Sequence, residues 1–393
     1  MSRRIAIVAH AAVPADPRIR RQCDVLSLAG YEVDVFALRA PGEPAEERDG
    51  SLRIIRLPVS RRFTGFAGHL AEYLAFAGLA TVRLTAEHRR RHYDLVQVAT
   101  LPDFLVVAAS ALKLAGVPLL LDLHEDMPAF FDDRFAARPL RPLRPLIRAA
   151  ARGSAAMADH LLTVHEPLRA LAIARGVAPG KISVVMNSPD ERLFDPSRHA
   201  RRSFMADGEL RLIHHGALQR IYGLEVAIEA IARLAQASDP PLRLDVYGDG
   251  PQRAALAAAI ARHGVGDRVH LNGRVSMDEL PSLLAVSDAG LVPSLPEPYL
   301  ELSLSTKLLE YVAMDVPVIA SDLATFRAYF DAGAIRYVPG GDPAALAAAI
   351  RELAADPDAA ASRAAEAKRQ AAPYAASAQA RAYLGVIERL LVT

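Results

Sequence analysis

The sequence predicts an α/β protein with two doubly wound domains, each a parallel β-sheet covered by helices. Short apolar runs, of the kind that a strand buried on both faces needs, alternate with segments of helical periodicity along most of the chain. The alternation restarts after a polar, Arg-rich stretch at 195–209. Strands separated by helices pair in parallel through crossover connections, so we expect one sheet in each half.

The N-terminal half opens with the apolar run RIAIVA (4–9), and the helix that follows, from Pro17, closes on Gly30. A helix is also expected from Gly223 to about 236, and the Ala-rich segment 342–371 keeps helical spacing. We therefore divide the chain into a domain at 1–200, a domain at 201–372 and a final amphipathic helix within 373–393. The remaining strands are expected at 31–38, 51–57, 94–99, 117–123, 160–164, 181–186, 210–216, 242–248, 267–273, 287–294 and 316–321.

Composition excludes several classes of protein. The 46 basic and 45 acidic residues give a net charge of +1, which excludes a dedicated nucleic-acid binder held by a large positive field. Cys23 is the single cysteine, so no intramolecular disulfide can form. The longest uncharged stretches are about eleven residues, too short for a membrane-spanning helix. Met-Ser-Arg-Arg runs straight into an apolar strand, so we expect no signal peptide and a cytoplasmic protein.

In doubly wound sheets the ligand lies beyond the carboxyl ends of the strands, so with two such domains we expect the site in a cleft between them. The segment LSLSTKLLE (302–310) carries the most chemistry. Ser305 and Thr306 are N-cap residue types, and free backbone N–H groups of the first turn, together with Lys307, suit a diphosphate. Glu310 can accept both hydroxyls of a ribose. The alternative is an ordinary capped helix with a solvated lysine.

The segment HHGALQRIYGL (214–224) is a second candidate, with a strand that ends at Gly216 and a loop that holds Arg220. Arg220 could approach the same anion as Lys307 and neutralise a leaving diphosphate without a metal. The alternative is a surface arginine. On the N-terminal side, His124 and Glu125 follow a strand, where polar clusters usually face a ligand, although a histidine there could equally cap backbone groups.

These segments, together with LDVYGDGPQRAALAAAI, DRVHLNGRVSMDELPSLLAVSDAGLVPS and TKLLEYVAMDVPVIAS, resemble the donor domain of retaining glycosyltransferases of the GT-B fold, specifically glycosyltransferase family 4. The N-terminal half is similar to the same family through DPRIRRQCDVLSLAGYEVDVFAL, LLLDLHED and ISVVMNSPDERLF. The resemblance implies two Rossmann-like domains that face a central cleft, and a C-terminal helix that crosses back onto the N-terminal domain.

The resemblance also implies site residues. Glu310 matches the ribose-binding glutamate, Ser305 and Thr306 the diphosphate-binding turn, and His124 a histidine that projects toward the donor sugar. Arg274 and Val275 would contact the base through their backbone. Gly216, Tyr222, Gly248 and Ser303 complete the donor-binding set, and His10, Asp16, Arg18 and Glu125 are assigned to the acceptor side.

The sequence departs from the family pattern at three positions. Leu302 stands where the family usually has the first glutamate of Glu-x7-Glu, so the sugar contact falls to Glu301 or Ser303. Ala217 and Tyr222 replace the usual arginine and lysine of the first donor loop. We expect Arg220 and Lys307 to supply the missing charge, because an uncompensated diphosphate in a dry cleft is costly.

The expected reaction transfers a sugar from a nucleotide diphosphate sugar to an acceptor hydroxyl with retention of configuration, in glycan, polysaccharide or glycolipid biosynthesis. The leaving phosphate helps to deprotonate the acceptor, so no protein nucleophile is needed. We expect no cofactor and no metal, because the single DxD match, Asp356 to Asp358, reads as a helix junction. The sequence leaves open whether the donor base is that of UDP, GDP, ADP or TDP.

The acceptor is expected to be a glycan or a lipid-linked sugar. Residues 1–200 hold 27 basic and 22 acidic residues, and the stretch Phe63 to Leu84 is apolar and helical in period. This surface could hold the protein at the inner face of an anionic membrane; a solvated charged face is the alternative. A nucleotide-sugar epimerase of the same fold, or a non-catalytic two-domain binding protein, remains open as well. The arginines that would form this basic surface are Arg61, Arg62, Arg89 to Arg91, Arg134, Arg138, Arg141, Arg144, Arg148 and Arg152.

Overall fold

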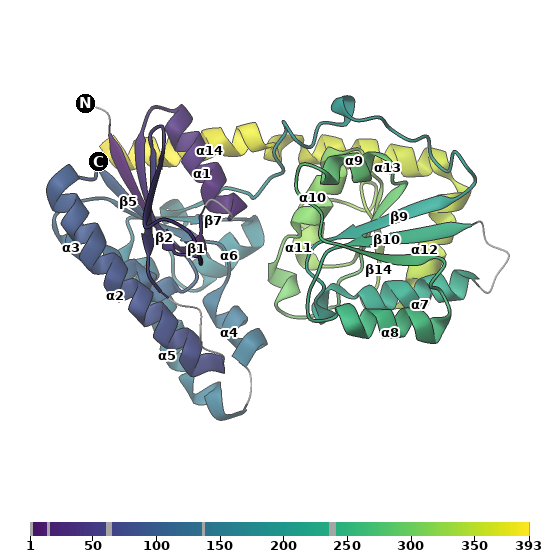
Figure 1. Cartoon of the computed structure of the whole chain (residues 1–393), viewed down its shortest axis with the longest axis horizontal. Coiled ribbons are helices and arrows are strands. Elements are labelled where there is room, and N and C mark those ends of the chain that lie inside the picture. Colours follow the sequence, from purple (N-terminus) through teal and green to yellow (C-terminus); the bar gives the residue numbers. More distant parts are fainter. Residues whose placement is uncertain (1–2, 14–15, 60–64, 136–137, 236–240, 393) are drawn as a thin grey trace. The chain divides into compact units, whose positions relative to one another are not determined.

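The structure, a computed structural model, describes residues 3–13, 16–59, 65–135, 138–235 and 241–392, and its chain forms two compact units (Figure 1). Unit 1 comprises Met1–Asn187 and Gln379–Thr393, and unit 2 comprises Ser188–Ala378. The division falls after Asn187 and Ala378, compared with the predicted boundaries at 200 and 372. Within the described part of the chain, every helix is too short or too polar to cross a membrane.

Unit 1 is built on an eight-stranded sheet with the order β3-β4-β2-β1-β5-β6-β7-β8. All neighbouring strands pair in parallel except β3 (Glu46–Asp49), which forms an antiparallel pair with β4. The strand β3 was not predicted, because its four residues, EERD, are all charged and exposed and give no apolar signal. The other strands are β1 (Arg4–Ala12), β2 (Glu32–Leu38), β4 (Leu52–Leu57), β5 (Leu95–Ala99), β6 (Leu119–Leu123), β7 (His160–Thr163) and β8 (Ile182–Val184).

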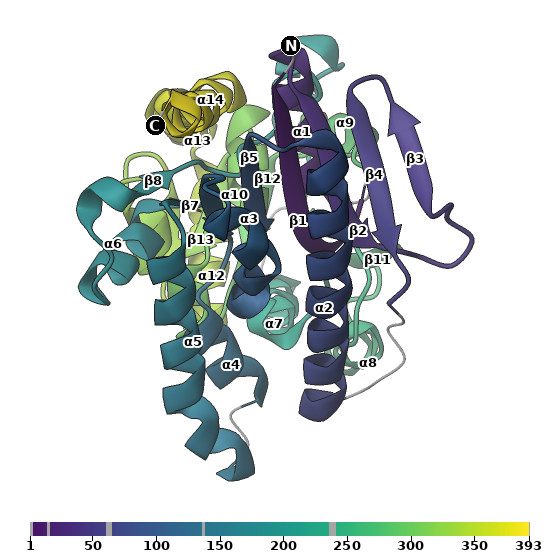
Figure 2. The same cartoon turned by 90° about the vertical axis from the view of Figure 1, so that its left-hand side faces the viewer.

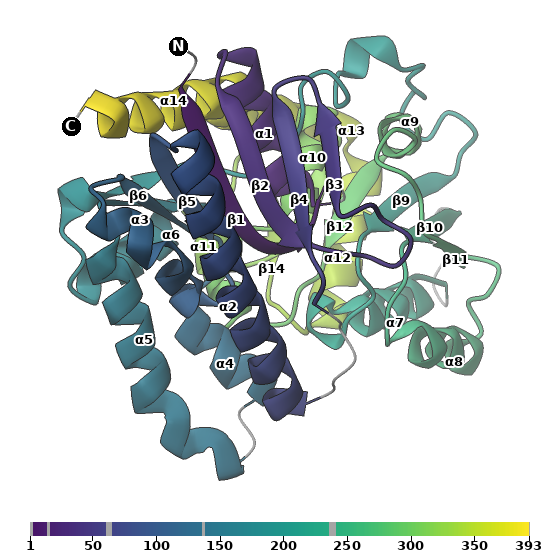
Figure 3. The ribbon, with the colours of Figure 1, turned by 60° about the vertical axis from the view of Figure 1, so that its left-hand side comes forward.

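Helices cover both faces of this sheet. The long helix α2 (Gly65–Arg91) crosses β1, β2 and β4 on one face (Figure 2). On the other face, α1 (Pro17–Leu28) and the C-terminal helix α14 (Ala376–Val392) pack into one core with β1 and β2 (Figure 3). Unit 1 also contains α3 (Ser110–Leu114), α4 (Met127–Phe135), α5 (Arg144–Met157), α6 (Glu166–Ala174), η1 (Asp103–Ala109), η2 (Arg138–Leu143) and η3 (Pro179–Lys181).

The start of α1 follows from its sequence. Asp16 is the N-cap, and its side chain accepts the backbone N–H groups of Arg18 and Ile19 at 2.9 and 3.4 Å. Pro17 stands at the first helical position, where its missing N–H costs nothing. The helix then buries Cys23 at the centre of its inner face. This packing holds the polar end of α1 at the carboxyl end of β1.

Unit 2 contains a six-stranded sheet, parallel throughout, with the order β11-β10-β9-β12-β13-β14. The strand β14 (Arg336–Val338) was not predicted, because three residues are too few to show a period. The predicted architecture of two parallel-sheet α/β domains is confirmed. The other strands are β9 (Leu210–His215), β10 (Leu242–Tyr247), β11 (Val269–Gly273), β12 (Ala289–Val292) and β13 (Val318–Ser321).

The helices α7 (Leu224–Ala235), α8 (Arg253–His263) and α12 (Pro343–Ala355) contribute buried residues to the main core of unit 2. At Asp356, α12 ends and α13 (Pro357–Ala371) begins; the Asp356 side chain caps α13 by accepting the Ala359 N–H at 2.9 Å. The prediction of a helix junction at Asp356 to Asp358 is therefore confirmed. Shorter elements are α9 (Leu280–Ala285), α11 (Ala324–Arg327), η4 (Pro196–Arg198), η5 (Arg220–Tyr222), η6 (Leu300–Leu302) and η7 (Ala372–Tyr374).

The helix α10 (Thr306–Ala313) is fixed to the sheet of unit 2 by Tyr311. The Tyr311 ring occupies the space above Gly290 of β12, where an added Cβ would lie 2.4 Å from the ring. Its hydroxyl donates to the Ile213 carbonyl of β9 at 3.3 Å. Any larger residue at position 290 would push the ring away, so this contact sets how α10 presents its first turn.

Candidate active site

The first turn of α10 places Lys307 directly over the glycine that ends β9. A Cβ at Gly216 would lie 2.8 Å from Cε and 3.1 Å from Nζ of Lys307, so a larger residue here would displace the end of the lysine side chain from its present position. Gly216 also has a φ of +113°, a backbone conformation that other residues rarely adopt. The Nζ atom lies 4.3 Å from the centre of the Tyr222 ring. Lys307 is therefore held between a glycine turn and an aromatic face.

Glu310 lies one turn further along α10, beside the end of β9. Its Oε2 is 3.2 Å from Nε2 of His215, and both side chains are almost fully buried. Burial, and then the charge of Lys307, lower the pKa of His215 well below its usual range, so its imidazole is neutral at physiological pH. Burial likewise lowers the pKa of Lys307, whereas Glu310 raises it. The cluster thus combines one buried cation, one carboxylate and one neutral imidazole.

The backbone beside this cluster is made of close glycine contacts. Gly248, which follows β10, lies so near Gly216 that an added Cβ would be 1.8 Å from the Gly216 carbonyl oxygen. The Gly216 N–H donates to the Tyr247 carbonyl at 2.8 Å, and the Gly248 N–H donates to the Gly273 carbonyl at 2.6 Å. The ends of β9, β10 and β11 are therefore tied together as one backbone platform.

The structure brings Gly216, Tyr222, Lys307 and Glu310 together, but it places Arg220 apart from this cluster. Arg220 on η5 has a side chain that is 62% exposed, and its Nη2 donates to Glu297 Oε1 at 2.7 Å. The cluster contains one cation where the sequence analysis expected two. Lys307 and the amides of α10 therefore supply the positive field of this cluster.

The remaining donor-side candidates differ in their settings. Ser305 is the N-cap of α10 and makes no side-chain cap hydrogen bond, so its hydroxyl does not satisfy the amides of the first turn that begins at Thr306. Arg274 is 82% exposed along its side chain, 3.6 Å from Asp249, while Val275 is half-buried. Ser303 follows η6 in extended conformation.

Glu301 has a structural partner. Its Oε2 accepts the Ala324 N–H at 2.8 Å, at the start of α11, and its backbone carbonyl accepts the hydroxyl of Thr325. In this state the Glu301 carboxylate ties η6 to α11. A sugar contact through Glu301 would have to compete with that hydrogen bond.

In unit 1, a cavity of about 450 Å³ contains all five residues that the sequence analysis selected there. Its lining includes His10, Asp16, Arg18, His124 and Glu125. His10 lies near the carboxyl end of β1, His124 and Glu125 follow β6, and Asp16 and Arg18 open α1, so the carboxyl ends of parallel strands bring them together.

Two close side-chain pairs shape the cavity. Nε2 of His10 lies 3.1 Å from Oε1 of Glu72, the one carboxylate in the mostly apolar segment 65–82 of α2. Arg18 forms a two-point ion pair with Asp16, with distances of 3.1 and 2.8 Å. Burial alone would raise the pKa of Asp16, but Arg18 and two backbone N–H groups lower it on balance, so Asp16 is a carboxylate at neutral pH.

His124 lies beside a buried hydrogen-bond relay that runs from Asp122 to the C-terminal helix. Oδ2 of Asp122 lies 3.1 Å from Nε2 of His124 and accepts the side-chain amide of Gln22 at 2.6 Å. Gln97 Nε2 donates to Gln22 at 2.8 Å and approaches Asp122 at 3.3 Å. The Tyr383 hydroxyl of α14 donates to Oε1 of Gln97 at 2.6 Å.

The relay keeps Asp122 charged inside the protein. Burial alone would raise the pKa of Asp122, but His124, Gln22 and Arg18 together lower it. A carboxylate in this position fixes one tautomer and one ring orientation of the histidine beside it. Sequence reasoning missed Asp122, Gln22, Gln97 and Tyr383, and only the period of LLLDLH, which places Asp122 and His124 on the same side of a strand, could have indicated the first of them.

Among the described residues, no three His, Cys, Asp or Glu side chains gather in a way that could hold a metal ion. The buried His214 is engaged elsewhere: its Nδ1 lies 3.0 Å from the Leu291 carbonyl, and burial, followed by the charge of Lys307, lowers its pKa to about 3. The groups that the described residues offer to a ligand of unit 2 are therefore the charges of Lys307 and Glu310 and the hydrogen-bond groups around them.

Comparison with known proteins identifies both halves of the chain. The family model "Glycosyl transferases group 1" matches residues 209–356, and the model "Glycosyl transferase 4-like domain" matches residues 15–188. A 2-deoxystreptamine glucosyltransferase of Streptomyces kanamyceticus is 30% identical over 295 residues, which cover 71% of this chain and 75% of the relative. An alpha-D-kanosaminyltransferase of the same organism is 22% identical, over 86% of this chain and 90% of the relative.

Solved structures share the fold over the full length. Sucrose-phosphate synthase from Thermosynechococcus elongatus matches with a TM-score of 0.79 at 20% identity, covering 99% of each chain. Anabaena HepE in complex with UDP-glucose matches with a TM-score of 0.71 at 16% identity, covering 98% of this chain and 99% of that chain. The fold is GT-B, and the epimerase and the non-catalytic binding protein are not favoured by these relatives.

Proposed function

Because this chain belongs to the group 1 glycosyltransferases, we propose that it uses the Lys307–Glu310 cluster of unit 2 to hold the nucleoside diphosphate of its sugar donor. The chain is a glycosyltransferase that uses a nucleotide sugar in glycan biosynthesis. The structural relative HepE was solved with UDP and with UDP-glucose, which supports UDP as the nucleotide to test first.

The diphosphate would lie at the start of α10. The first-turn amides of a helix carry about half a positive charge, and the ammonium of Lys307, 4.3 Å from the Tyr222 ring centre, adds a full one. Burial of Lys307 strengthens this attraction, because the charge is poorly screened by water. One buried lysine with helix amides would take the part that a divalent cation plays in metal-dependent transferases, so we propose that the reaction needs no metal.

Glu310 would accept the two ribose hydroxyls. Both of its oxygens carry lone pairs, and neutral His215, 3.2 Å away, fixes one of them without adding a charge. Arg274 and Val275 would contribute backbone contacts to the base, and Arg220 would join the diphosphate only by leaving Glu297. Ser303 or Glu301 would contact the sugar hydroxyls.

The acceptor would enter the 450 Å³ cavity of unit 1. His124, oriented by Asp122, would face the donor sugar, while the side chains of His10 and Glu125 and the Asp16–Arg18 ion pair would bind acceptor hydroxyls. The charged and neutral groups that line this cavity suit a polyhydroxylated acceptor, such as a glycan or a lipid-linked sugar.

We propose transfer with retention of configuration. The bond between the anomeric carbon and the diphosphate oxygen breaks, and the electron pair leaves with the nucleoside diphosphate. The acceptor oxygen bonds to the anomeric carbon from the same face, and its proton passes to the departing phosphate. Lys307 and the α10 amides stabilise the charge that grows on the leaving group.

The observation that carries this proposal is the position of Lys307 over Gly216, one turn from Glu310. The test is calorimetric titration of UDP into the wild type and the variants Lys307→Met and Glu310→Gln. Each variant should weaken UDP binding about tenfold or more, since a hydrogen bond to a charged group is worth roughly 1.5–3 kcal/mol. Lys368→Met is the matched control, because Lys368 of α13 pairs with Asp315, which follows α10, at 2.8 Å. Equal UDP affinity in all four proteins would reject the site.

We also propose that α2 holds the protein against an anionic bilayer. Its outer face carries exposed Leu70, Leu74, Leu79 and Val82, and Arg89 and Arg90 are exposed at its end; Arg61 and Arg62 lie outside the described residues. An apolar face with adjacent cations suits anionic lipid. Flotation should recover the wild-type protein with phosphatidylglycerol vesicles, and the double variant Leu74→Gln, Val82→Gln should no longer float with them. Equal recovery of the wild type with phosphatidylcholine vesicles, or no recovery with either lipid, would reject this proposal.

A further inference from the structure

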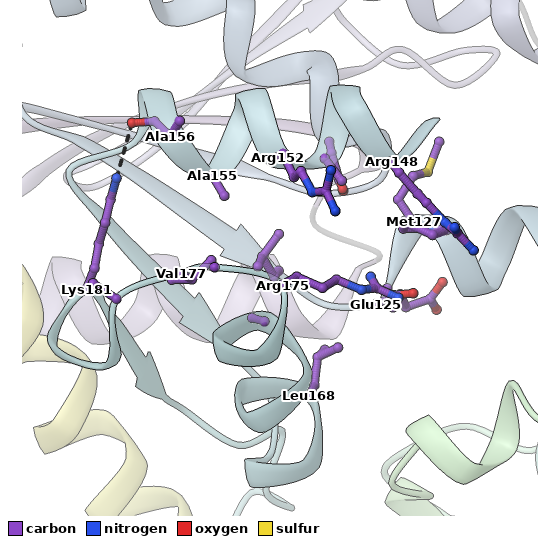
Figure 4. Close-up of a pocket in the computed structure, with 18 residues that line it drawn as sticks. Glu125, Met127, Arg148, Arg152, Ala155, Ala156, Leu168, Arg175, Val177 and Lys181 are labelled. Carbon is purple, nitrogen blue, oxygen red and sulfur yellow. Dashed lines mark hydrogen bonds and ion pairs between the residues drawn. The ribbon is translucent and has the colours of Figure 1, made fainter. Parts of the chain in front are cut away.

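A second cavity of unit 1, of about 630 Å³, lies between α5 and α6 and shares Glu125 with the 450 Å³ cavity described above (Figure 4). It has the volume of a small-molecule site. Small and apolar residues form much of its wall, among them Ala155 of α5, Leu168 of α6 and Val177 of the following loop. The abundance of alanine on α5 leaves the space between the two helices unfilled.

The rim of the cavity has more cations than the protein itself neutralises. Arg175 forms an ion pair with Asp126, and Lys181 donates to the Ala156 carbonyl at 3.1 Å. Arg148 and Arg152, one turn apart on α5, have no ion pair or hydrogen bond with any residue in the described part of the chain. Both project from α5 toward the side where Arg175 and Glu125 lie (Figure 4).

The cavity also contains a buried acid with an unused oxygen. Asp103 is only 4% exposed, and its Oδ1 has no hydrogen-bond partner in the described structure. Burial, and then the charge of Asp126, raise the pKa of Asp103 to about 7. Much of this carboxyl is therefore protonated near neutral pH, when it can donate a hydrogen bond and adds little negative charge.

We propose that this cavity binds an amphiphilic phosphate ester, with the phosphate on Arg148 and Arg152 and the hydrocarbon body on the wall of Ala155, Leu168 and Val177. Two guanidinium groups on adjacent turns match the several oxygens of a phosphate, and each offers a planar pair of donors. The apolar wall suits hydrocarbon, because a sugar ring would need more polar partners than the carboxyl of Asp103 supplies.

The role of such an ester in glycosyl transfer rests on the proposed function. Glu125 lines both this cavity and the acceptor cavity. A sugar or other group carried on the bound phosphate would therefore point toward His124. The ester would then be the lipid-linked acceptor itself. Binding to the cavity does not depend on that role, so it can be measured without any transfer reaction.

The test is calorimetric titration of the full-length protein with farnesyl phosphate, farnesol, glucose 6-phosphate and inorganic phosphate. Farnesyl phosphate should bind at least about tenfold more tightly than the other three, since its phosphate and its chain each add contacts. The double variant Arg148→Gln, Arg152→Gln should lose at least about tenfold in affinity for farnesyl phosphate. The control is Arg262→Gln with Arg381→Gln, which removes the same charge from exposed positions on α8 and α14.

Two further arms separate the possible outcomes. Farnesyl phosphate in phosphatidylcholine vesicles should also bind, because a lipid-linked acceptor would be presented in a bilayer; binding of the free ester alone would reject the role as a membrane-bound acceptor. UDP titration should give one affinity for the wild type and both double variants, so loss of the donor site and loss of this cavity are seen separately. Unchanged binding of farnesyl phosphate by the Arg148, Arg152 variant, or equal binding of farnesol or of glucose 6-phosphate, would overturn the proposal. Both arginines are exposed, so the variant should keep the thermal stability of the wild type.

Discussion

Replacing Asp122 with asparagine is expected to slow glycosyl transfer while leaving the binding of the nucleotide unchanged. Asparagine keeps the size of the side chain but removes the carboxylate that lies 3.1 Å from His124 and accepts the Gln22 amide at 2.6 Å. A hydrogen bond to a charged group contributes about 1.5–3 kcal/mol. If this energy orients His124 in the transition state, kcat should fall about 10- to 150-fold, since roughly 1.36 kcal/mol corresponds to a factor of ten.

The same substitution should lower the stability of unit 1 by about 1–3 kcal/mol, because Gln22 and Gln97 are left facing a neutral group. The pKa of Asp122 lies below its ordinary value of 3.8, so its carboxylate stabilises the fold above that pH, and the difference from the variant should shrink as the pH falls below it.

The assay for Asp122→Asn measures initial rates of transfer from UDP-glucose, the UDP dissociation constant, and urea unfolding at several pH values. Tyr383→Phe removes the far end of the relay and should give a smaller loss of kcat in the same direction. Asp132→Asn, at a half-exposed ion pair with Arg144, is the matched control. A variant with normal kcat but reduced stability would show that Asp122 supports the fold alone, and the orienting role would be refuted.

Three other outcomes are expected. Lys307→Met should raise KM for the nucleotide sugar more than tenfold, while Lys368→Met leaves it unchanged, as measured from initial rates. Gly290→Ala should lower the midpoint of thermal unfolding, because the new Cβ would lie 2.4 Å from the Tyr311 ring and displace α10, at a cost of about 1–3 kcal/mol; a midpoint equal to that of the wild type would contradict the packing argument. His214 has a pKa of about 3 in the folded state, against an ordinary value of 6.5, so as the pH drops below about 6.5 the unfolded chain binds this proton first and the free energy of unfolding should fall. His214→Asn should flatten this dependence of the unfolding free energy on pH, as measured by urea titrations at several pH values. An unaltered dependence would exclude His214 as its source.

The sequence predicted the sheets well wherever strands are apolar and buried. The run RIAIVA became β1, and LRLIHH became β9, because parallel strands covered on both faces must be apolar throughout. The hairpin strand β3 and the three-residue β14 could not be predicted, since one is wholly charged and the other too short to show a period.

The candidate site was predictable to the extent that it follows strand ends. His10, Asp16, Arg18, His124 and Glu125 line one cavity for that reason. The ion pair of Arg220 with Glu297 and the hydrogen bond of Glu301 to Ala324 were not predictable, because both depend on side chains that reach across loops of unit 2. The relay from Asp122 to Tyr383 joins residues 261 positions apart in number (383 − 122), a separation over which local patterns carry no information.

The path of the chain through the two units has a consequence for how the protein is made. Residues 379–392, which supply Tyr383, Val386 and Ile387 to the core of unit 1, leave the ribosome only after all of unit 2 has been synthesised. Until then the first 187 residues have an open apolar face over β1 and β2 and a Gln97 that lacks its tyrosine partner. The N-terminal portion must therefore wait, incomplete and exposed to aggregation or chaperone binding, for the last segment to be translated.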